Sequence, residues 1–220
     1  MPSDLHCPLC LKQASALFHQ DKRRPYYRCR LCALVFVPPL FYLSSEDERA
    51  EYDLHDNSVT DPRYRQFLSR LAAPLLSRLK TASRGLEFGC GPGPALAAML
   101  QEAGHQVALY DSFYHRDQSV LQGSYDFICA TEVAEHLHQP GVELDRLWSL
   151  LEPGGYLGVM TKLVVSQEAF TRWHYKADPT HVCFFSKRTW SWWAERHQAV
   201  VEFIGSDVIL LKKSGLDLGG

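Results

Sequence analysis

Two cysteine hooks near the start of the chain constrain its fold most. They read Cys7-Pro-Leu-Cys10 and Cys29-Arg-Leu-Cys32, with 18 residues between them. A tetrahedral Zn²⁺ ion takes four thiolates, and each Cys-x-x-Cys turn supplies two of them from one tight bend. A redox pair or unrelated cysteines would explain one hook, but two hooks at this separation favour zinc. We therefore predict a zinc ribbon over residues 1–40, with a structural metal held by Cys7, Cys10, Cys29 and Cys32.

The size and composition of the chain suit one ordinary domain with a small appendage, since it has 220 residues of which 46% are hydrophobic. No apolar run approaches the roughly 18 residues that a membrane helix needs. The first residues lack the basic start and apolar core of a signal peptide. The other cysteines, Cys90, Cys129 and Cys183, form no pairing pattern. We therefore expect a cytoplasmic protein with no membrane partner.

The charge is unevenly distributed along the chain. Residues 1–40 hold six Lys and Arg against two Asp, whereas the remainder holds 17 basic and 23 acidic residues. A positive ribbon could contact RNA. The favoured interpretation is a solvated outer face of the ribbon.

The pattern after the ribbon predicts a polar linker and then an α/β domain. Residues 41–61 are rich in acids, and Asp61-Pro62 is typical of a helix start. Apolar residues then recur at helical spacing over 62–80, with Pro74 as a possible kink. Short apolar strands are predicted at 85–88, 106–110, 125–130 and 155–161, helices at 94–103, 140–151 and 186–197, and a closing hairpin at 200–205 and 208–212. Such alternation predicts a doubly wound, mostly parallel sheet over 62–220, with one antiparallel strand.

A glycine-rich loop, Glu87–Gly93, follows the first of these strands. Glycines between a buried strand and a helix let the backbone approach a ligand, and the helix N-terminus adds donors. A dinucleotide fingerprint would need a further glycine where Pro94 stands. The acid two residues before the first glycine instead resembles the first motif of class I S-adenosylmethionine-dependent methyltransferases.

Three more segments resemble the same family. Asp111 ends the second strand, Ala130–Leu137 resembles the "E-H-L/V" segment, and Leu151–Gly155 resembles the "LxPGG" turn. The resemblance covers roughly residues 62–212. It implies a Rossmann-like, doubly wound, seven-stranded sheet, whose third strand must be shortened because little chain separates Asp111 from Tyr125.

The resemblance also implies roles for single residues in holding S-adenosyl-L-methionine. Glu87 would orient the methionine amino group, and Asp111 would accept hydrogen bonds from both ribose hydroxyls. The other residues expected at the cofactor are Gly89, Cys90, Gly91, Gly93, Thr131 and Glu132. Cys90 is expected to act as a small residue facing the cofactor and not as a nucleophile.

Candidates for acceptor chemistry lie in two later segments. His181 precedes Phe184-Phe185-Ser186 and resembles the histidine before the "YFS"-type segment of zinc-containing sugar C-methyltransferases, which also begin with a Cys-x-x-Cys pair of hooks. His181, His136 and Asp178 are the predicted catalytic residues, with His181 as general base. His136 could equally order a turn, and His181 could be a structural histidine.

The main hypothesis is a methyltransferase that acts on a small-molecule or sugar-type acceptor. An RNA methyltransferase whose ribbon contacts RNA is the first alternative, because ribosomal RNA methyltransferases also pair a Cys-rich zinc module with this fold. A non-catalytic binding module is the second alternative.

Overall fold

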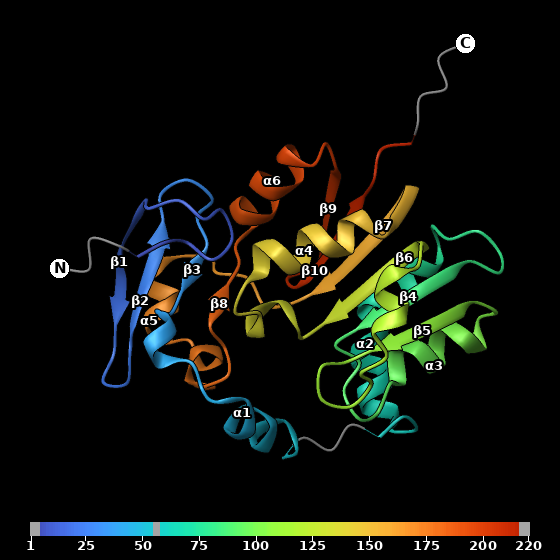
Figure 1. The fold of residues 1–220 in the computed structure, drawn as a ribbon, viewed down its shortest axis with the longest axis horizontal. Helices are drawn as coiled ribbons and strands as arrows, with labels where there is room; N and C mark the ends of the chain where they lie inside the picture. The colour runs from blue at the N-terminus through green and yellow to red at the C-terminus, as the bar shows by residue number, and fades with distance from the viewer. Residues whose placement is uncertain (1–4, 55–57, 216–220) are drawn as a thin grey trace, which may run out of the picture.

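The computed structural model describes residues 5–54 and 58–215. The remaining residues, which include 55–57 of the predicted linker and both chain ends, lie outside this description. The described residues form two sheets that lie side by side, with helices around the larger one (Figure 1).

The smaller sheet is antiparallel and has four strands in the order β1-β2-β3-β8. Three of them come from the N-terminal region: β1 (Ser15–Gln20), β2 (Pro25–Cys29) and β3 (Val35–Phe36). The fourth, β8 (Cys183–Phe184), comes from the far end of the sequence and pairs with β3. We call residues 5–37 the cysteine module. Its sheet is therefore completed by the part of the chain that was predicted as a separate domain.

The larger sheet has six strands in the order β5-β4-β6-β7-β10-β9. Strands β4 (Arg84–Phe88), β5 (Gln106–Tyr110), β6 (Tyr125–Thr131) and β7 (Leu151–Met160) are parallel. The hairpin of β9 (Val200–Ile204) and β10 (Val208–Lys212) adds its β10 antiparallel to β7. The predicted doubly wound, mostly parallel sheet is confirmed.

The strand count of seven is not met, because no third strand lies between β5 and β6 in this fully described part of the chain. The chain instead makes a turn after Asp111 and a short 3₁₀ helix, η2 (Gln118–Gln122). A further parallel strand needs a crossover of a dozen or more residues in addition to the strand itself. The segment between β5 and β6 is too short for both, so β5 forms the edge of the sheet.

Helices cover both faces of the larger sheet. On one face lie α2 (Pro62–Leu76) and α3 (Ala95–Glu102), and on the other α4 (Pro140–Ser149) and α6 (Lys187–Arg196) (Figure 1). Alternate side chains of β6 point to opposite faces, so Phe127 packs in the core under α2 and Ile128 in the core under α4. Both faces of the sheet are thus buried, as expected for parallel strands.

The predicted linker contains regular structure. It holds a 3₁₀ turn, η1 (Pro39–Phe41), and an eight-residue helix, α1 (Ser45–Tyr52). The Ser44 hydroxyl caps α1 by accepting a hydrogen bond from the amide of Asp47 at 3.2 Å. Three acids in the first turn favour the helix N-terminus electrostatically. The helix begins here because of its cap and charges, since none of its side chains is buried.

The cysteine module packs directly on the larger domain. One continuous hydrophobic core runs from the module to the α4 and α6 face of the six-stranded sheet. One close contact is at Gly141 in α4, whose amide donates to the carbonyl of Pro8 at 3.3 Å. A Cβ at this glycine would lie 2.4 Å from the carbonyl oxygen of Leu9. The first cysteine hook therefore lies against the start of α4 with no room for a side chain between them.

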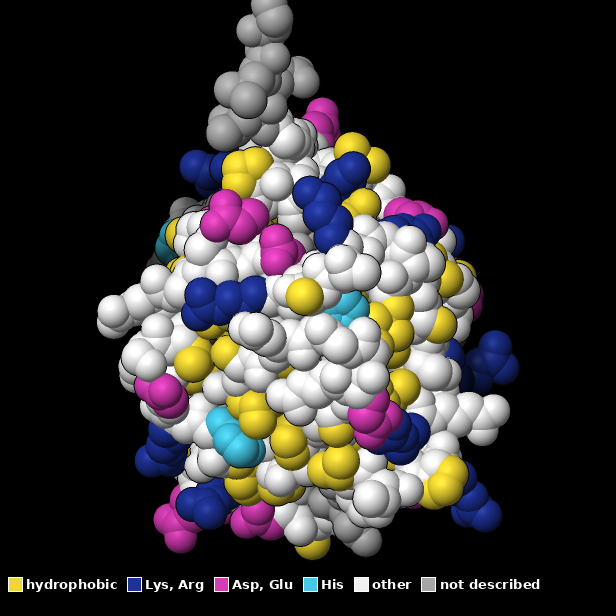
Figure 2. All heavy atoms as spheres, turned by 90° about the vertical axis from the view of Figure 1, so that its right-hand side faces the viewer, with side chains coloured by type: hydrophobic (Ala, Val, Ile, Leu, Met, Phe, Trp, Pro, Cys, Tyr) yellow, Lys and Arg dark blue, Asp and Glu magenta, His cyan; other side chains and the backbone are white. Residues whose placement is uncertain are grey.

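Acidic and basic side chains are interspersed on the face of the molecule seen in Figure 2. This face carries charges of both signs, which agrees with the small net charge of −2. Every helix within residues 5–54 and 58–215 is too short or too polar to cross a membrane.

Candidate functional site

A cavity of about 940 Å³ lies where the parallel strands β4, β5 and β6 end. Ligands bind outside the carboxyl ends of strands in sheets of this kind. One side of the cavity, which we call the strand wall, is formed by residues 87–92, 110–114 and 131–133. A second part of the lining, which we call the composite wall, is formed by residues of 45–52, 136–139 and 178–181.

The glycine loop gives the strand wall its open shape. Gly89 and Gly91 have φ angles of +72° and +63°, in the region that favours glycine. A Cβ at Gly89 would lie 2.4 Å from a methyl carbon of Val133. The loop therefore requires glycine here both for its backbone conformation and for close packing against the end of β6.

Two buried carboxylates flank this loop. Glu87 accepts a hydrogen bond from the amide of Ala97 in α3 at 2.8 Å, and burial raises its pKa to about 8. Asp111 accepts from the amides of Gly91 at 2.9 Å and Phe113 at 2.8 Å. The oxygen that accepts from Phe113, Oδ1, also accepts from the amide of Tyr114 at 3.1 Å. Each carboxylate oxygen has two lone pairs, so one lone pair, on Oδ2, stays available for a ligand.

The other residues predicted at the cofactor lie close by, with one exception. Thr131, Glu132 and Cys90 line the cavity, whereas Gly93 does not and lies at the start of α3. Glu132 has a φ of +51°, a strained conformation for a side chain of this size. Burial, reinforced by the nearby Glu135 carboxylate, raises its pKa to about 8. Burial also raises the pKa of the Cys90 thiol, which keeps it protonated and a poor nucleophile.

The composite wall brings the three predicted catalytic residues together, because His136, Asp178 and His181 all line the cavity. The His136 and His181 rings have centroids 4.7 Å apart. Nε2 of His181 lies 3.6 Å from a carboxylate oxygen of Asp178. Nδ1 of His181 lies 2.7 Å from the carbonyl oxygen of Tyr175. Since a carbonyl can only accept, His181 carries its proton on Nδ1, and Nε2 keeps a free lone pair.

The ionisation of this group follows from its burial. Burial, with repulsion from His136, lowers the pKa of His181 from 6.5 to about 4, although Glu135 and Asp178 oppose the shift. Burial would raise the pKa of Asp178, but hydrogen bonds from Thr180 and the nearby His181 lower it below its ordinary value. At neutral pH the pair is therefore a neutral imidazole beside a carboxylate.

Two residues outside the predicted catalytic set, Glu135 and Tyr175, lie behind this group. Glu135 is completely buried and accepts a short hydrogen bond from the Tyr175 hydroxyl, while its second carboxylate oxygen has no hydrogen-bond partner among the described residues. Burial raises the pKa of Glu135. Ligand atoms of Glu135, His136 and His181 lie within 4.8 Å of one another, a spacing that a metal ion could also bridge. Glu135 precedes His136 in the "E-H-L" segment, so a signal for it was present.

The helix of the predicted linker was also missed as part of the site. Tyr52 of α1 lines the cavity, and its ring packs edge-on against His136 with centroids 5.2 Å apart. Its hydroxyl donates to Glu48 at 3.0 Å, and the Tyr114 hydroxyl donates to Asp53 at 2.5 Å. Helix α1 thus connects the composite wall to the turn that follows Asp111.

The four cysteines of the module converge on one point. Their sulfur atoms all lie within 4.8 Å of one another, and the Cys7–Cys32 and Cys10–Cys29 pairs are each 3.5 Å apart. Two thiolates on one zinc ion, each about 2.3 Å from it, are about 3.8 Å apart in tetrahedral geometry. The prediction that both hooks form a single four-sulfur site is confirmed, and its donor set suits structural zinc.

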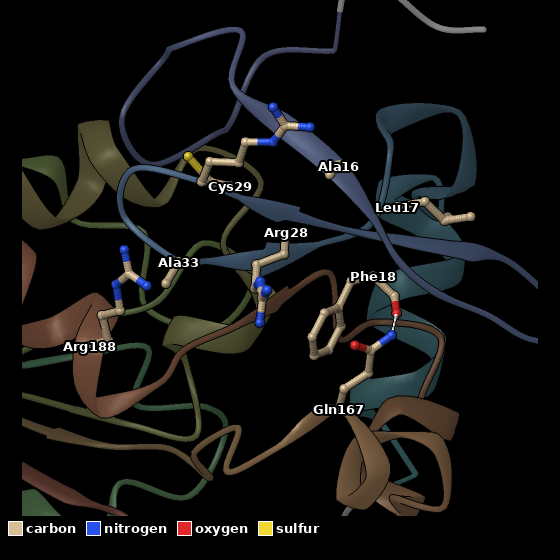
Figure 3. A pocket seen from close by; sticks show the side chains of 9 residues that line it. Ala16, Leu17, Phe18, Arg28, Cys29, Ala33, Gln167 and Arg188 are labelled. Atoms are coloured by element: carbon tan, nitrogen blue, oxygen red, sulfur yellow. Dashed lines mark hydrogen bonds between the residues drawn. The ribbon is translucent and has the colours of Figure 1, made fainter.

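A second cavity of about 250 Å³ lies beside the module's sheet. Arg28, Arg30 and Arg188 line it together with Gln167, whose amide donates to the Phe18 carbonyl at 2.5 Å (Figure 3). The three arginines make this cavity basic, and no acidic side chain of residues 5–54 or 58–215 lines it.

Comparisons with solved structures agree with this architecture. A 1,6-didemethyltoxoflavin-N1-methyltransferase from Burkholderia thailandensis, solved with 1,6-didemethyltoxoflavin and S-adenosylhomocysteine, is 16% identical with a TM-score of 0.53; the match covers 89% of this chain and 98% of that one. Magnesium protoporphyrin IX methyltransferase from Synechocystis PCC 6803, solved with S-adenosylhomocysteine, is 14% identical with a TM-score of 0.54, over 79% and 96% of the two chains. A SAM-dependent methyltransferase from Archaeoglobus fulgidus is 17% identical with a TM-score of 0.52, over 68% and 94%. The shared feature is the fold.

Sequence comparisons lead to the same family. The biotin biosynthesis bifunctional protein BioCD of Bordetella avium is 30% identical over 128 residues, which cover 49% of this chain but only 26% of that protein. A model of the methyltransferase domain family matches residues 60–202. The chain therefore belongs to the methyltransferase domain family and has the fold of S-adenosylmethionine-dependent methyltransferases.

Proposed function

We propose that the protein transfers a methyl group from S-adenosylmethionine to a small-molecule acceptor. One observation carries this proposal: the glycine loop with Asp111 and the His181 group line the same cavity. A donor held by the strand wall would therefore share this cavity with an acceptor held by the composite wall. Such positioning can supply much of the rate enhancement for a displacement at an activated methyl group.

The residues of the strand wall suit the methyl donor. Asp111 offers one free lone pair, on Oδ2, to a ribose hydroxyl, and the bare backbone at Gly91 leaves room for the methionine part. Glu87 lies behind the loop, where a positively charged donor would favour its ionised form. We include Cys90, Thr131 and Glu132 among the residues that contact the donor. Gly93 is assigned instead to the start of α3.

The residues of the composite wall suit removal of a proton from the acceptor. The free Nε2 of His181 can accept a proton, and Asp178, 3.6 Å away, would stabilise the resulting imidazolium. His136 lies beside both and would contact the acceptor. The low pKa of His181 keeps it in the basic form at neutral pH. An acceptor with an acidic hydroxyl or carbon matches such a weak base.

Aromatic side chains favour a compact acceptor with a ring. Tyr52 and Phe113 line the cavity and contact each other edge-on with centroids 5.7 Å apart. Pockets with a few polar groups among aromatic walls are typical of small-molecule sites. This supports a small acceptor, such as a phenol or a sugar derivative.

A transfer assay tests the proposal. The chain is incubated with methyl-labelled S-adenosylmethionine and panels of phenols, sugar nucleotides and total RNA, and label is counted in each product. We expect label in a small molecule, and His181→Gln should lower turnover by about 10²-fold while the affinity for S-adenosylhomocysteine stays unchanged. Thr171→Ala, on an exposed helix away from the cavity, serves as the matched control. Full turnover by His181→Gln would contradict the role of His181.

RNA is the second candidate acceptor, favoured by the three arginines of the smaller cavity. Its test is the same assay with RNA, at 50 and 200 mM salt, using Arg28→Ala and Arg188→Ala. Phosphate contacts would make binding fall steeply with salt, and each variant would reduce that dependence. Label in RNA would replace the small-molecule proposal.

A further inference from the structure

The hairpin turn of the cysteine module reaches the loop that carries His181. Arg24 lies in this turn between β1 and β2, and only 6% of it is exposed. Its guanidinium donates four hydrogen bonds to backbone carbonyls of that loop: to Lys176 at 3.1 Å, Asp178 at 2.7 Å, Pro179 at 2.9 Å and His181 at 2.9 Å. Its Nε donates to the Tyr26 hydroxyl at 3.2 Å. The sequence suggested that the basic residues of the ribbon, Arg24 among them, lie on a solvated outer face. The structure instead buries Arg24.

These contacts determine the shape of the loop. A buried guanidinium is costly unless its N–H groups are bonded, and here both Nη1 and Nη2 donate to carbonyls of one short loop. Any other path of residues 176–181 would leave several buried donors without acceptors. Asp21, in the same turn, accepts from the Arg24 amide at 3.0 Å and from Lys176 Nζ at 3.2 Å, which places compensating charge nearby.

A second connection from the module reaches the residue after His181. The amide of Val37 donates to the carbonyl of Val182 at 2.9 Å, and the amide of Val182 donates to the carbonyl of Glu135 at 2.8 Å. Strand β8 follows immediately and pairs with β3. His181 therefore lies between Arg24 on one side and the module's sheet on the other.

We propose that the cysteine module is a structural part of the acceptor site, and that Arg24 is the positioning residue through which it acts. By fixing the loop, Arg24 keeps the His181 ring with Nδ1 on the Tyr175 carbonyl and Nε2 beside the Asp178 carboxylate. This inference rests on the proposed function, since it concerns the histidine proposed to face the acceptor. Its main test requires no methyl transfer, so its failure is distinguishable from failure of that function.

The test reads the His181 ring in the full chain, with zinc bound. Histidine is labelled with ¹⁵N, and the His181 signals among the ten histidines are assigned with His181→Gln. A ring fixed on a carbonyl shows a single tautomer, protonated on Nδ1. Arg24→Ala should convert this to averaged signals, and Arg24→Lys, which keeps the charge and some donors, should retain part of the wild-type signature.

Arg23→Ala is the matched control. Arg23 neighbours Arg24 but is exposed and donates only one side-chain hydrogen bond to the loop, to Ala177 at 2.7 Å. We expect the wild-type tautomer in this variant. In all three arginine variants we expect one zinc per chain and a Kd for S-adenosylhomocysteine within about twofold of the wild-type value.

Two results would overturn the proposal. One is an unchanged His181 tautomer in an Arg24→Ala chain that keeps its zinc. The other is loss of zinc or of S-adenosylhomocysteine binding in both Arg24→Ala and Arg24→Lys, which would show that Arg24 stabilises the fold in general. With an acceptor from the transfer assay, Arg24→Ala should also lower kcat by about 10²-fold, the effect of misplacing a reacting group by roughly 1 Å, with the affinity for the donor unchanged.

Discussion

The two walls of the cavity are built in different ways. The strand wall comes from three adjacent parallel strands, and their register places its carboxylates and glycines. The composite wall is assembled from α1, the 3₁₀ turn η3 (Ala134–His136) and the loop before β8, and the cysteine module binds that loop. The strand wall therefore depends on local sequence, whereas the composite wall depends on contacts between distant segments. Changes far from the cavity should therefore affect the two walls unequally.

Cys29→Ser should have the largest effect. It removes one of four thiolates, and zinc in modules of this type contributes on the order of 10 kcal/mol to folding. We expect zinc loss and faster hydrogen exchange in residues 5–37 and also in 173–185, with S-adenosylhomocysteine still bound. Cys90→Ser, outside the module, should keep its zinc. Faster exchange confined to 5–37 would show that the module is separable from the composite wall.

Asp111→Ala should affect only the strand wall. Loss of hydrogen bonds to a carboxylate should weaken S-adenosylhomocysteine binding by about 1.5–3 kcal/mol, roughly 10- to 150-fold in Kd. Calorimetry measures this, and the His181 signals should stay as in the wild type. Asp117→Ala removes an exposed acid from the same turn and should leave Kd unchanged. Equal affinities for both variants would remove Asp111 from the donor site.

Glu87→Gln tests how much the buried carboxyl group of the strand wall destabilises the folded protein at neutral pH. Folded Glu87 holds its proton up to about pH 8, whereas the unfolded chain releases it near 4.5. A raised pKa stabilises the folded state below pH 4.5, and this stability is lost as pH rises toward 8. Between pH 5 and 8, the free energy of unfolding of the variant should therefore rise relative to that of the wild type by on the order of 2 kcal/mol. Melting curves recorded without ligand measure this difference. The exposed Glu195→Gln should show no such trend.

Gly141→Ala should have the smallest effect and test the contact between the module and α4. The new methyl group meets the Leu9 carbonyl, and overpacking of about 1–3 kcal/mol is partly offset by better helix propensity. A net loss of about 1 kcal/mol should lower Tm by about 2–4 °C, with donor affinity unchanged. Val142→Ala, on the same helix at 51% exposure, is the control. An unchanged Tm relative to this control would mean that the module moves to accommodate the methyl group without a measurable loss of stability.

The sequence predicted the larger sheet well, because its strands are short, mostly apolar segments that alternate with helical patterns. Strand β5 has the predicted bounds, and β6 extends one residue further than predicted. Strand β8 was missed, since two residues have no periodicity to read. Helix α1 was taken as a linker because it buries no side chain.

The candidate site divides in the same way. Glu87 and Asp111 were found through motifs next to strands, and the structure places both at the cavity. Arg24 was expected on a solvated face and Tyr175 was left out of the catalytic set, because their contacts are with partners distant in sequence. Arg24 lies more than 150 residues from the loop it binds, and Tyr175 lies 40 residues from Glu135. No local pattern contains such information.

The position of β8 has a consequence for synthesis on the ribosome. The cysteines and the first three strands of the small sheet are made within the first 36 residues, but the strand that completes the sheet ends at Phe184. At about 5–20 residues per second, the module waits on the order of ten seconds for its last partner. During this time the edge of β3 is unpaired, and exposed edges invite association with other chains. Early binding of zinc would hold the nascent module in shape until the rest of the protein arrives.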